Sequence, residues 1–285
     1  MEQILRTNNI KKAYGDKKVL HNINITLNKG ELVSILGVSG VGKTTLFNVL
    51  SGLAMPDEGS VFLYKDSGSD YNETDFDEAP YYGTDSSKNN SKSIQNNSDD
   101  SSKGCIDITG KTGYLSYMLQ KDLLLPHKTV IENVALPLLL NKMPKKKALK
   151  MAEEHFEQFG LSGTQKSYPA ELSGGMRQRA ALLRTYLCNK DVALLDEPFS
   201  ALDTITRASM QEWYLSVMRE IKLSTLFITH DMDEAILLSD RIYIMKGSPA
   251  TIADEIVIKE PRPRTTDFTL TDNFLDYKRR IRRML

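Results

Sequence analysis

The stretch GVSGVGKTT, residues 37–45, constrains this chain most, because it follows the apolar run ELVSIL and opens a helix-like segment. It fits the pattern G-x-x-x-x-G-K-[ST], with Gly37, Gly42, Lys43 and Thr44 in the fixed places. Glycines let the backbone wrap a phosphate chain, the lysine brings positive charge to the β and γ groups, and the threonine hydroxyl can ligate Mg²⁺. A simple glycine turn is the alternative, but the strand before it and the helix after it favour a phosphate-binding loop.

A second glycine-rich helix start lies far downstream, in ELSGGMRQRAALLRTYL (residues 171–187). Ser173 can cap this helix, and the free N–H groups of its first turn form an anion site. One chain therefore carries two helix starts that are each suited to bind a phosphate, and a function for the chain has to explain why there are two.

Acidic and imidazole groups follow two other apolar runs. VALLDEP ends in Asp196 and Glu197, and TLFITHD places His230 at the end of a further strand. Paired acids after a strand often form only a solvated turn. Next to a phosphate loop at the end of a parallel sheet, where ligands bind, we expect Asp196 to hold Mg²⁺ and Glu197 to polarise an attacking water. The other histidines, His21, His127 and His155, carry no functional signal.

Short apolar strands alternate with helical segments, which predicts an α/β fold on a largely parallel sheet. Leu46, Leu50 and Leu53 are expected on one buried helix face after the loop, and residues 129–187 read as an inserted helical region. In that region two further faces are predicted, one ending at Gly160: Leu149, Ala152, Phe156 and Phe159, then Met176, Ala180, Leu183 and Leu187.

Residues 65–104 break this pattern, with nine Asp or Glu, four Lys and many Ser and Asn. Such a segment cannot bury enough apolar surface to offset its ordering entropy, so we expect a disordered acidic surface insertion. It is either an idle loop or an acidic tether to the basic tail NFLDYKRRIRRML. The tail spaces four apolar residues like one helix face, and it is either a solvated helix or a contact to lipid headgroups or a membrane partner: Phe274, Tyr277, Ile281 and Leu285.

Bulk composition excludes several classes of protein. The formal net charge is zero, which gives no support for nucleic-acid binding. Cys105 and Cys188 are lone thiols, so neither a disulfide framework nor a metal cluster is indicated. No apolar run approaches the roughly 20 residues that span a bilayer, and no signal peptide is evident. A soluble protein of a reducing compartment is expected.

These motifs, in this order, resemble the ATP-binding subunit of ABC transporters, over nearly the whole chain except 65–104. LSGGMRQR is similar to the family signature, SALD (Ser200 to Asp203) to its D-loop, and Gln120 in YMLQ to its Q-loop glutamine. Tyr14 in KKAYG resembles the aromatic residue that stacks on adenine. The resemblance implies a P-loop NTPase (RecA-like) core with an antiparallel β edge and an inserted α-helical subdomain.

The resemblance also implies a domain plan and a set of site residues. The ATPase domain is expected over 1–250, with its core at 1–64 and 105–120 together with 188–250, a helical subdomain at 121–187, and a C-terminal extension at 251–285. The expected catalytic residues are Lys43, Gln120, Glu197 and His230, and the expected Mg²⁺ ligands are Thr44, Gln120 and Asp196. The expected ATP-binding residues are Tyr14, Gly37, Ser39, Gly40, Gly42, Lys43, Thr44, Thr45, Ser173, Gly174, Gly175 and Gln178.

A head-to-tail pair of ATPase subunits explains the two glycine-rich helix starts. In the family that the chain resembles, the signature of each subunit faces the phosphate loop of the other. Ser173, Gly174 and Gly175 would then donate to the neighbour's γ-phosphate, where the helix dipole adds to the attraction. ATP would hold the two subunits together, and hydrolysis would release them and drive a membrane partner.

The finer text QKDLLLPHKTVIENVALPLLL and KEPRPRT is most similar to the nitrate, sulfonate and taurine importer group, which includes thiamine-precursor importers. The implied partners are a second ATPase subunit, permease subunits and an extracytoplasmic substrate-binding protein, at the cytoplasmic face of the membrane. An export or lipoprotein-release ATPase is an alternative. A soluble ABC ATPase on ribosomes or DNA, or an ATP-holding module without turnover, fits less well. The transported solute is not encoded in this chain.

Overall fold

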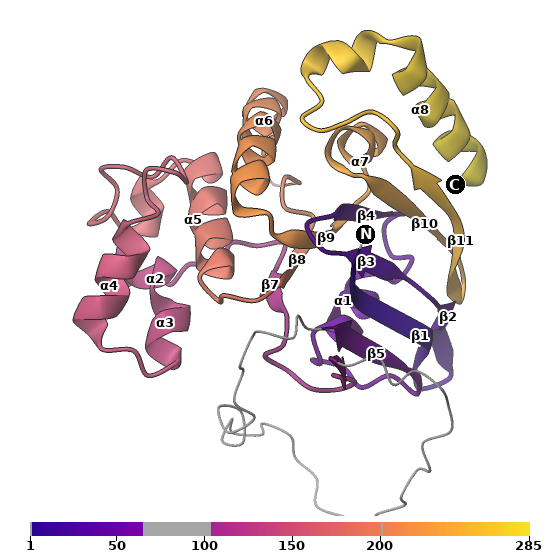
Figure 1. Ribbon diagram of the computed structural model, residues 1–285, viewed down its shortest axis with the longest axis horizontal. Coiled ribbons are helices and arrows are strands. Elements are labelled where there is room, and N and C mark those ends of the chain that lie inside the picture. The colour runs from indigo at the N-terminus through magenta and orange to yellow at the C-terminus, as the bar shows by residue number, and fades with distance from the viewer. Residues whose placement is uncertain (1, 65–103, 201) are drawn as a thin grey trace, which may run out of the picture.

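The computed structural model describes residues 2–64, 104–200 and 202–285. A β-rich body carries a group of helices to one side, drawn from the middle of the chain (Figure 1). The expected disorder of the 65–104 insertion concerns residues that, apart from Gly104, lie outside the described ranges.

Within those ranges, eleven strands form one sheet in the order β6-β5-β1-β2-β11-β10-β4-β9-β8-β7, with β3 paired to β1. Its parallel part runs from β10 to β7. These strands are β4 (Leu32–Leu36), β7 (Ser116–Met118), β8 (Val192–Asp196), β9 (Ser224–Thr229) and β10 (Arg241–Gly247). Every residue of β4, β8 and β9 is buried, as expected for short apolar strands covered on both faces. The predicted α/β fold is confirmed.

The remaining strands pair antiparallel, except that β11 meets β2 in parallel. They are β1 (Gln3–Tyr14), β2 (Lys17–Ile23), β3 (Thr26–Asn28), β5 (Glu58–Tyr64), β6 (Cys105–Asp107) and β11 (Ala250–Val257). Tyr64 pairs directly with Cys105. The chain thus leaves and re-enters the sheet at adjacent positions, so the edge is complete without the residues between them.

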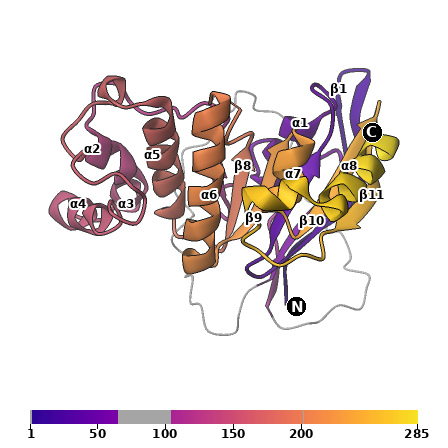
Figure 2. The ribbon, with the colours of Figure 1, turned by 90° about the horizontal axis from the view of Figure 1, so that it is seen from above.

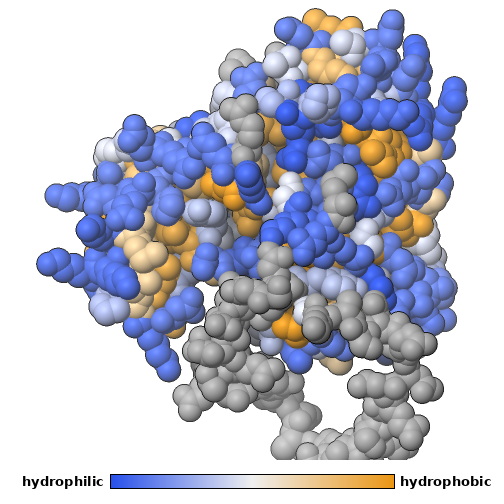
Figure 3. All heavy atoms as spheres, viewed as in Figure 1, coloured by the Kyte–Doolittle hydropathy of each residue, from blue (hydrophilic) through white to orange (hydrophobic). Residues whose placement is uncertain are grey.

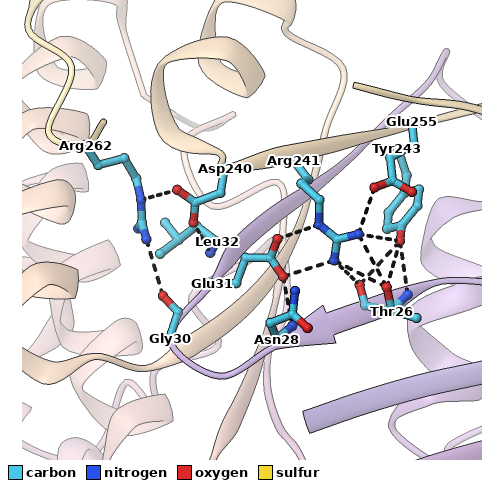
Figure 4. A network of polar contacts seen from close by, with 10 residues as sticks. All are labelled: Thr26, Asn28, Gly30, Glu31, Leu32, Asp240, Arg241, Tyr243, Glu255 and Arg262. Atoms are coloured by element: carbon cyan, nitrogen blue, oxygen red, sulfur yellow. Dashed lines mark hydrogen bonds and ion pairs between the residues drawn. The ribbon is translucent and has the colours of Figure 1, made fainter. Parts of the chain in front are cut away.

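A polar network ties the start of β4 to the neighbouring strands (Figure 4). The Arg241 guanidinium forms an ion pair with Glu31 and donates to the backbone oxygen of Thr26 at 2.8 Å. Asp240 accepts a hydrogen bond from the backbone N–H of Leu32 at 2.9 Å. Because β3, β4 and β10 are joined here, the end of β4 opposite the phosphate loop is held in place.

Three helices cover the parallel strands: α1 (Lys43–Leu50), α6 (Thr204–Ile221) and α7 (Met232–Leu238). Leu46 and Leu50 are fully buried as predicted, but Leu53 is 63 % exposed and its assignment to that face is wrong. The helix ends before it, and Gly52, at φ +78°, turns the chain away.

The lateral group contains α2 (Val130–Val134), α3 (Leu136–Leu140), α4 (Lys145–Glu153), the 3₁₀ turn η2 (Pro169–Glu171) and α5 (Gly174–Tyr186). The helix after Pro144 is shorter than the predicted run to Gly160. Phe156 and Phe159 are nonetheless buried, because their rings pack in the core beneath α5 and α6. Burial at these two positions is set by tertiary packing of a turn.

The C-terminal segment forms the 3₁₀ turn η3 (Thr266–Leu270) and α8 (Asp272–Met284), which lies beside α7 (Figures 1 and 2). Phe274, Tyr277 and Ile281 are buried in a cluster with α7, whereas Leu285 is 43 % exposed. The apolar face of the tail is therefore used within the chain, and its arginines remain outside.

Within the described ranges, no helix combines the length and apolarity needed to cross a bilayer. The face shown in Figure 3 is largely hydrophilic, with apolar residues in scattered groups.

Candidate nucleotide site

The phosphate loop connects β4 to α1, and its backbone requires glycine at two points. Gly42 has φ +117°, which L side chains rarely adopt, and a Cβ on Gly37 would lie 2.5 Å from the backbone oxygen of Met245. The loop borders a cavity of about 510 Å³. The cavity is lined by Lys17, Lys18, Val19, residues 39–45, Gln120, Glu197, Gly247 and Ser248.

Lys43 is the buried cation of this loop, with 5 % of its surface exposed. Its Nζ donates to the backbone oxygens of Gly37, at 2.8 Å, and Val38, at 3.1 Å. Burial lowers the pKa of Lys43, while Glu197 and Asp196 act to raise it. Since these two acceptors are uncharged carbonyl oxygens, the ammonium group is well placed to exchange them for phosphate oxygens.

Thr44 and Asp196 bring two oxygen donors together at the start of α1. Thr44 Oγ1 donates to Asp196 Oδ2 at 3.1 Å, and the Tyr117 hydroxyl donates to the same oxygen at 3.4 Å. Burial raises the pKa of Asp196, and the hydrogen bond from Thr44 lowers it. The described residues contain no group of three His, Cys, Asp or Glu able to hold a metal. Mg²⁺ needs only one or two carboxylates together with phosphate oxygens, so this pair fits it.

Gln120, Glu197 and His230 converge although they are distant in sequence. Glu197 Oε2 accepts from Gln120 Nε2 at 3.1 Å, and Glu197 Oε1 lies 3.2 Å from His230 Nδ1. Glu197 has φ +47°, and its N–H donates to the backbone oxygen of Ile228 at 3.1 Å. The two strand ends therefore hold the carboxylate and the imidazole at one edge of the sheet. Glu197 is 16 % exposed and His230 51 % exposed, so this edge opens to solvent.

The second glycine-rich helix start is formed as predicted, but away from the cavity. Ser173 is the N-cap of α5, and its Oγ accepts from the backbone N–H of Met176 at 3.2 Å. Gly174 and Gly175 form the first turn, and neither lines the cavity of the same chain. Gln178 is buried, and within the described part of the chain its Oε1 has no hydrogen-bond partner. In Figure 1, α5 belongs to the lateral helices and α1 to the β-rich body.

The remaining predicted residues lie around the loop. Ser39, Gly40 and Thr45 line the cavity. Tyr14 does not line it, but it is 52 % exposed at the end of β1 and pairs with Lys17, which does.

Some residues at the site carried no sequence signal. Tyr117 is the clearest case, because it precedes the Q-loop glutamine without a recognisable motif and still contacts Asp196. Lys17, Lys18, Gly247 and Ser248 reach the cavity only through the pairing of distant strands.

Comparison with known proteins places this geometry in a family. The family described as "ABC transporter" matches residues 20–200. The formylaminopyrimidine import ATP-binding protein ThiZ of Halalkalibacterium halodurans is 36 % identical, over 87 % of this chain and 82 % of that protein. The chain belongs to the ABC transporter family. The aliphatic sulfonates import ATP-binding protein SsuB of Bacillus cereus is 34 % identical, over 95 % of this chain and 89 % of that protein.

Solved structures of the family share the fold. The chain is similar to the ATP-binding cassette MJ0796 in a dimeric post-hydrolysis state with ADP and Pi, with a TM-score of 0.64 and 25 % identity over 90 % of this chain and all of that one. Both comparisons confirm the expected ATPase of the ABC transporter family.

Proposed function

We propose that this chain is the ATP-hydrolysing subunit of an importer that moves a small solute through a membrane permease. The proposal rests on five side chains that gather at the phosphate loop: Lys43, Asp196, Glu197, Gln120 and His230. The relatives named above are import ATP-binding proteins, and a further one is the bicarbonate transport ATP-binding protein CmpD of Synechocystis, 32 % identical over 94 % of this chain.

In this proposal the loop glycines bring backbone N–H groups against the phosphates of ATP, and Lys43 binds the β and γ groups. Tyr14 stacks on the adenine. Thr44 and Asp196, with Gln120, hold Mg²⁺, which neutralises charge on the phosphates when bound. The hydrogen bond of 3.1 Å between the Thr44 and Asp196 oxygens supports these two residues as ligands.

Glu197 orients and polarises the attacking water. It is held by Gln120 on one side and lies beside His230 on the other, so a water at its carboxylate would be directed by all three groups. General-base groups of this kind contribute about 10²–10⁴-fold to rate. The hydrolysed bond is the one between the γ-phosphorus and the bridging oxygen of ATP, and the leaving group is ADP.

The signature residues are proposed to act on the nucleotide of a second copy. Ser173, Gly174, Gly175 and Gln178 stay outside the cavity of their own chain, which supports a head-to-tail dimer with composite sites. The dimeric state of the similar cassette MJ0796 is in keeping with this. The helical subdomain at 121–187 would then turn with respect to the core as ATP binds and leaves.

The proposed setting is the cytoplasmic face of a membrane, with permease subunits and an extracytoplasmic substrate-binding protein as partners. The named relatives act on chemically different solutes, so the choice of solute belongs to those partners. Export or lipoprotein release is the second candidate. Co-purification with a permease and a binding protein would favour import.

Replacement of the proposed water-polarising group tests the chemistry. Glu197→Gln keeps the hydrogen bond to Gln120 but removes the carboxylate, so turnover should fall by about 10²–10⁴-fold while ATP still binds. The variant should accumulate as an ATP-bound dimer in size-exclusion chromatography. Turnover near that of the unaltered protein would refute the role of Glu197.

A further inference from the structure

His230 occupies a very short connection, and a buried carboxyl group stands behind it. Thr229 is the last residue of β9 and Asp231 is the N-cap of α7, so only His230 separates the strand end from the cap. Glu234, in the first turn of α7, is 6 % exposed, and Thr229 is 1 % exposed. None of the catalytic motifs accounts for a buried glutamate here.

A chain of hydrogen bonds runs from this carboxyl group around the histidine. Thr229 Oγ1 donates to Glu234 Oε2 at 2.6 Å. Thr229 Oγ1 in turn accepts a hydrogen bond from the backbone N–H of Asp231 at 2.9 Å. A hydroxyl group has one proton to donate, and Glu234 receives it, so the lone pairs of Thr229 Oγ1 are turned toward Asp231. The residues on both sides of His230 are thereby held through one carboxyl group.

Asp231 closes the arrangement from the other end. Its Oδ1 accepts from the backbone N–H groups of Asp233 at 2.8 Å and Glu234 at 3.2 Å. Its Oδ2 lies 3.7 Å from Arg207 Nη1, on α6. The connection is therefore fixed to β9, α6 and α7 at once. The side chain that it carries is His230, whose ring faces Glu197.

We propose that Glu234 is a positioning residue for His230, acting through the Thr229 hydroxyl and the backbone of Asp231. It touches neither nucleotide nor water. Its effect is on the direction in which the imidazole leaves the sheet, and so on the distance between His230 Nδ1 and Glu197. The inference rests on the proposed role of His230 in hydrolysis.

The charges around Glu234 indicate that its carboxyl group serves the hydrogen bond from Thr229 and not an ion pair. Burial raises the pKa of Glu234 to about 7, Asp231 and Glu197 add to this effect, and Arg207 and the hydrogen bond from Thr229 oppose it. Its Oε1 has no hydrogen-bond partner among the residues that the structure describes. The other cations that contact α7 bind elsewhere: Lys278 pairs with Asp233, and Arg264 donates to backbone oxygens at the helix end.

Paired substitutions separate positioning from bulk structure. Thr229→Val keeps the shape and removes the hydroxyl, and Glu234→Leu removes the acceptor, so each should lower kcat by about tenfold to a hundredfold without changing KM for ATP. Thr229→Ser and Glu234→Gln keep a donor and an acceptor and should stay within about threefold of the unaltered protein. Asp233→Asn, one residue away and facing α8, is the matched control and should have no effect.

A measurement without nucleotide keeps this test independent of the proposed function. The chain has four histidines, so the imidazole signal of His230 can be assigned by NMR with His230→Asn. Thr229→Val and Glu234→Leu should shift this signal, and Thr229→Ser should restore its position. An unshifted signal with kcat unchanged in both variants would overturn the proposal, as would equal losses in Thr229→Ser and Thr229→Val. If Glu197→Gln were fully active while the signal shifted, only the proposed function would fail.

Discussion

At the scale of single residues, the site combines groups whose charge is controlled by burial. Lys43 and Asp196 are both buried, and burial shifts each pKa toward the neutral form, while their mutual attraction opposes this. Burial also raises the pKa of Glu234, to about 7, and the hydrogen bond from Thr229 and the charge of Arg207 oppose this effect. Phosphate binding can compensate the buried charge of Lys43, whereas Glu234 is not among the residues that line the cavity.

The stability of the fold should therefore depend on pH through Glu234. Its pKa is raised from 4.5 to about 7, so the folded state holds this proton more tightly than the unfolded state. The free energy of unfolding then falls as pH rises from about 4.5 to about 7, and is level above. Glu234→Gln lacks this loss, so its stability relative to the unaltered protein should increase over that interval by up to about 3 kcal/mol.

Urea unfolding at pH 5 and pH 8 measures the effect, with Asp233→Asn as the control on the same helix. A constant difference between Glu234→Gln and the unaltered protein at the two pH values would contradict it.

At the scale of elements, α8 is part of the folded body. Its apolar face packs against α7, and Lys278 pairs with Asp233 on that helix. The tail therefore packs on the helix that begins directly after His230. The arginines of its other face are exposed.

Shortening a buried side chain of α8 should lower the free energy of unfolding, and shortening the exposed side chain after it should not. Ile281 is fully buried, so Ile281→Ala should lower the free energy of unfolding by about 2–4 kcal/mol. Leu285 is 43 % exposed and belongs to the same tail, so Leu285→Ala should change it by less than about 0.5 kcal/mol. Thermal or urea unfolding distinguishes the two, and equal small effects would mean that α8 is not docked in solution.

At the scale of the whole molecule, one chain presents two parts of the proposed nucleotide site that do not meet. The cavity contains the phosphate loop, and the signature helix start lies outside it, among the lateral helices. A second copy supplies the missing half in the proposed dimer. ATP would then favour the closed dimer because it contacts both subunits there and only one when they separate.

Mixing two inactive subunits tests this arrangement. Lys43→Ala removes the phosphate lysine, and Ser173→Arg blocks the signature, so each variant alone has both composite sites damaged. In the mixed dimer both lesions fall in one site and the other is intact, so ATP-dependent dimerisation and part of the ATPase activity should return. Activity no greater than that of the separate variants would exclude shared sites.

Much of the fold and of the candidate site could be predicted from local sequence, because these features depend on the backbone conformation of a few consecutive residues. The phosphate loop needs glycines where side chains cannot fit, as at Gly37 and Gly42, and a helix start needs a cap, as at Ser173. Short apolar strands that end at Asp196 and just before His230 signal a buried sheet whose ends meet. Such signals are contained within a few residues and survive without knowledge of the fold.

Tertiary structure alone decided the contacts between distant segments. Four features follow from which elements pack together. They are the hydrogen bond from Tyr117 to Asp196, the burial of Phe156 and Phe159 outside any helix, the exposure of Leu53, and the docking of α8. The role proposed for Glu234 is of the same kind, because a glutamate in the first turn of a helix is ordinary in sequence. Its burial against Thr229 arises only when β9 and α7 meet, and local sequence does not encode that approach.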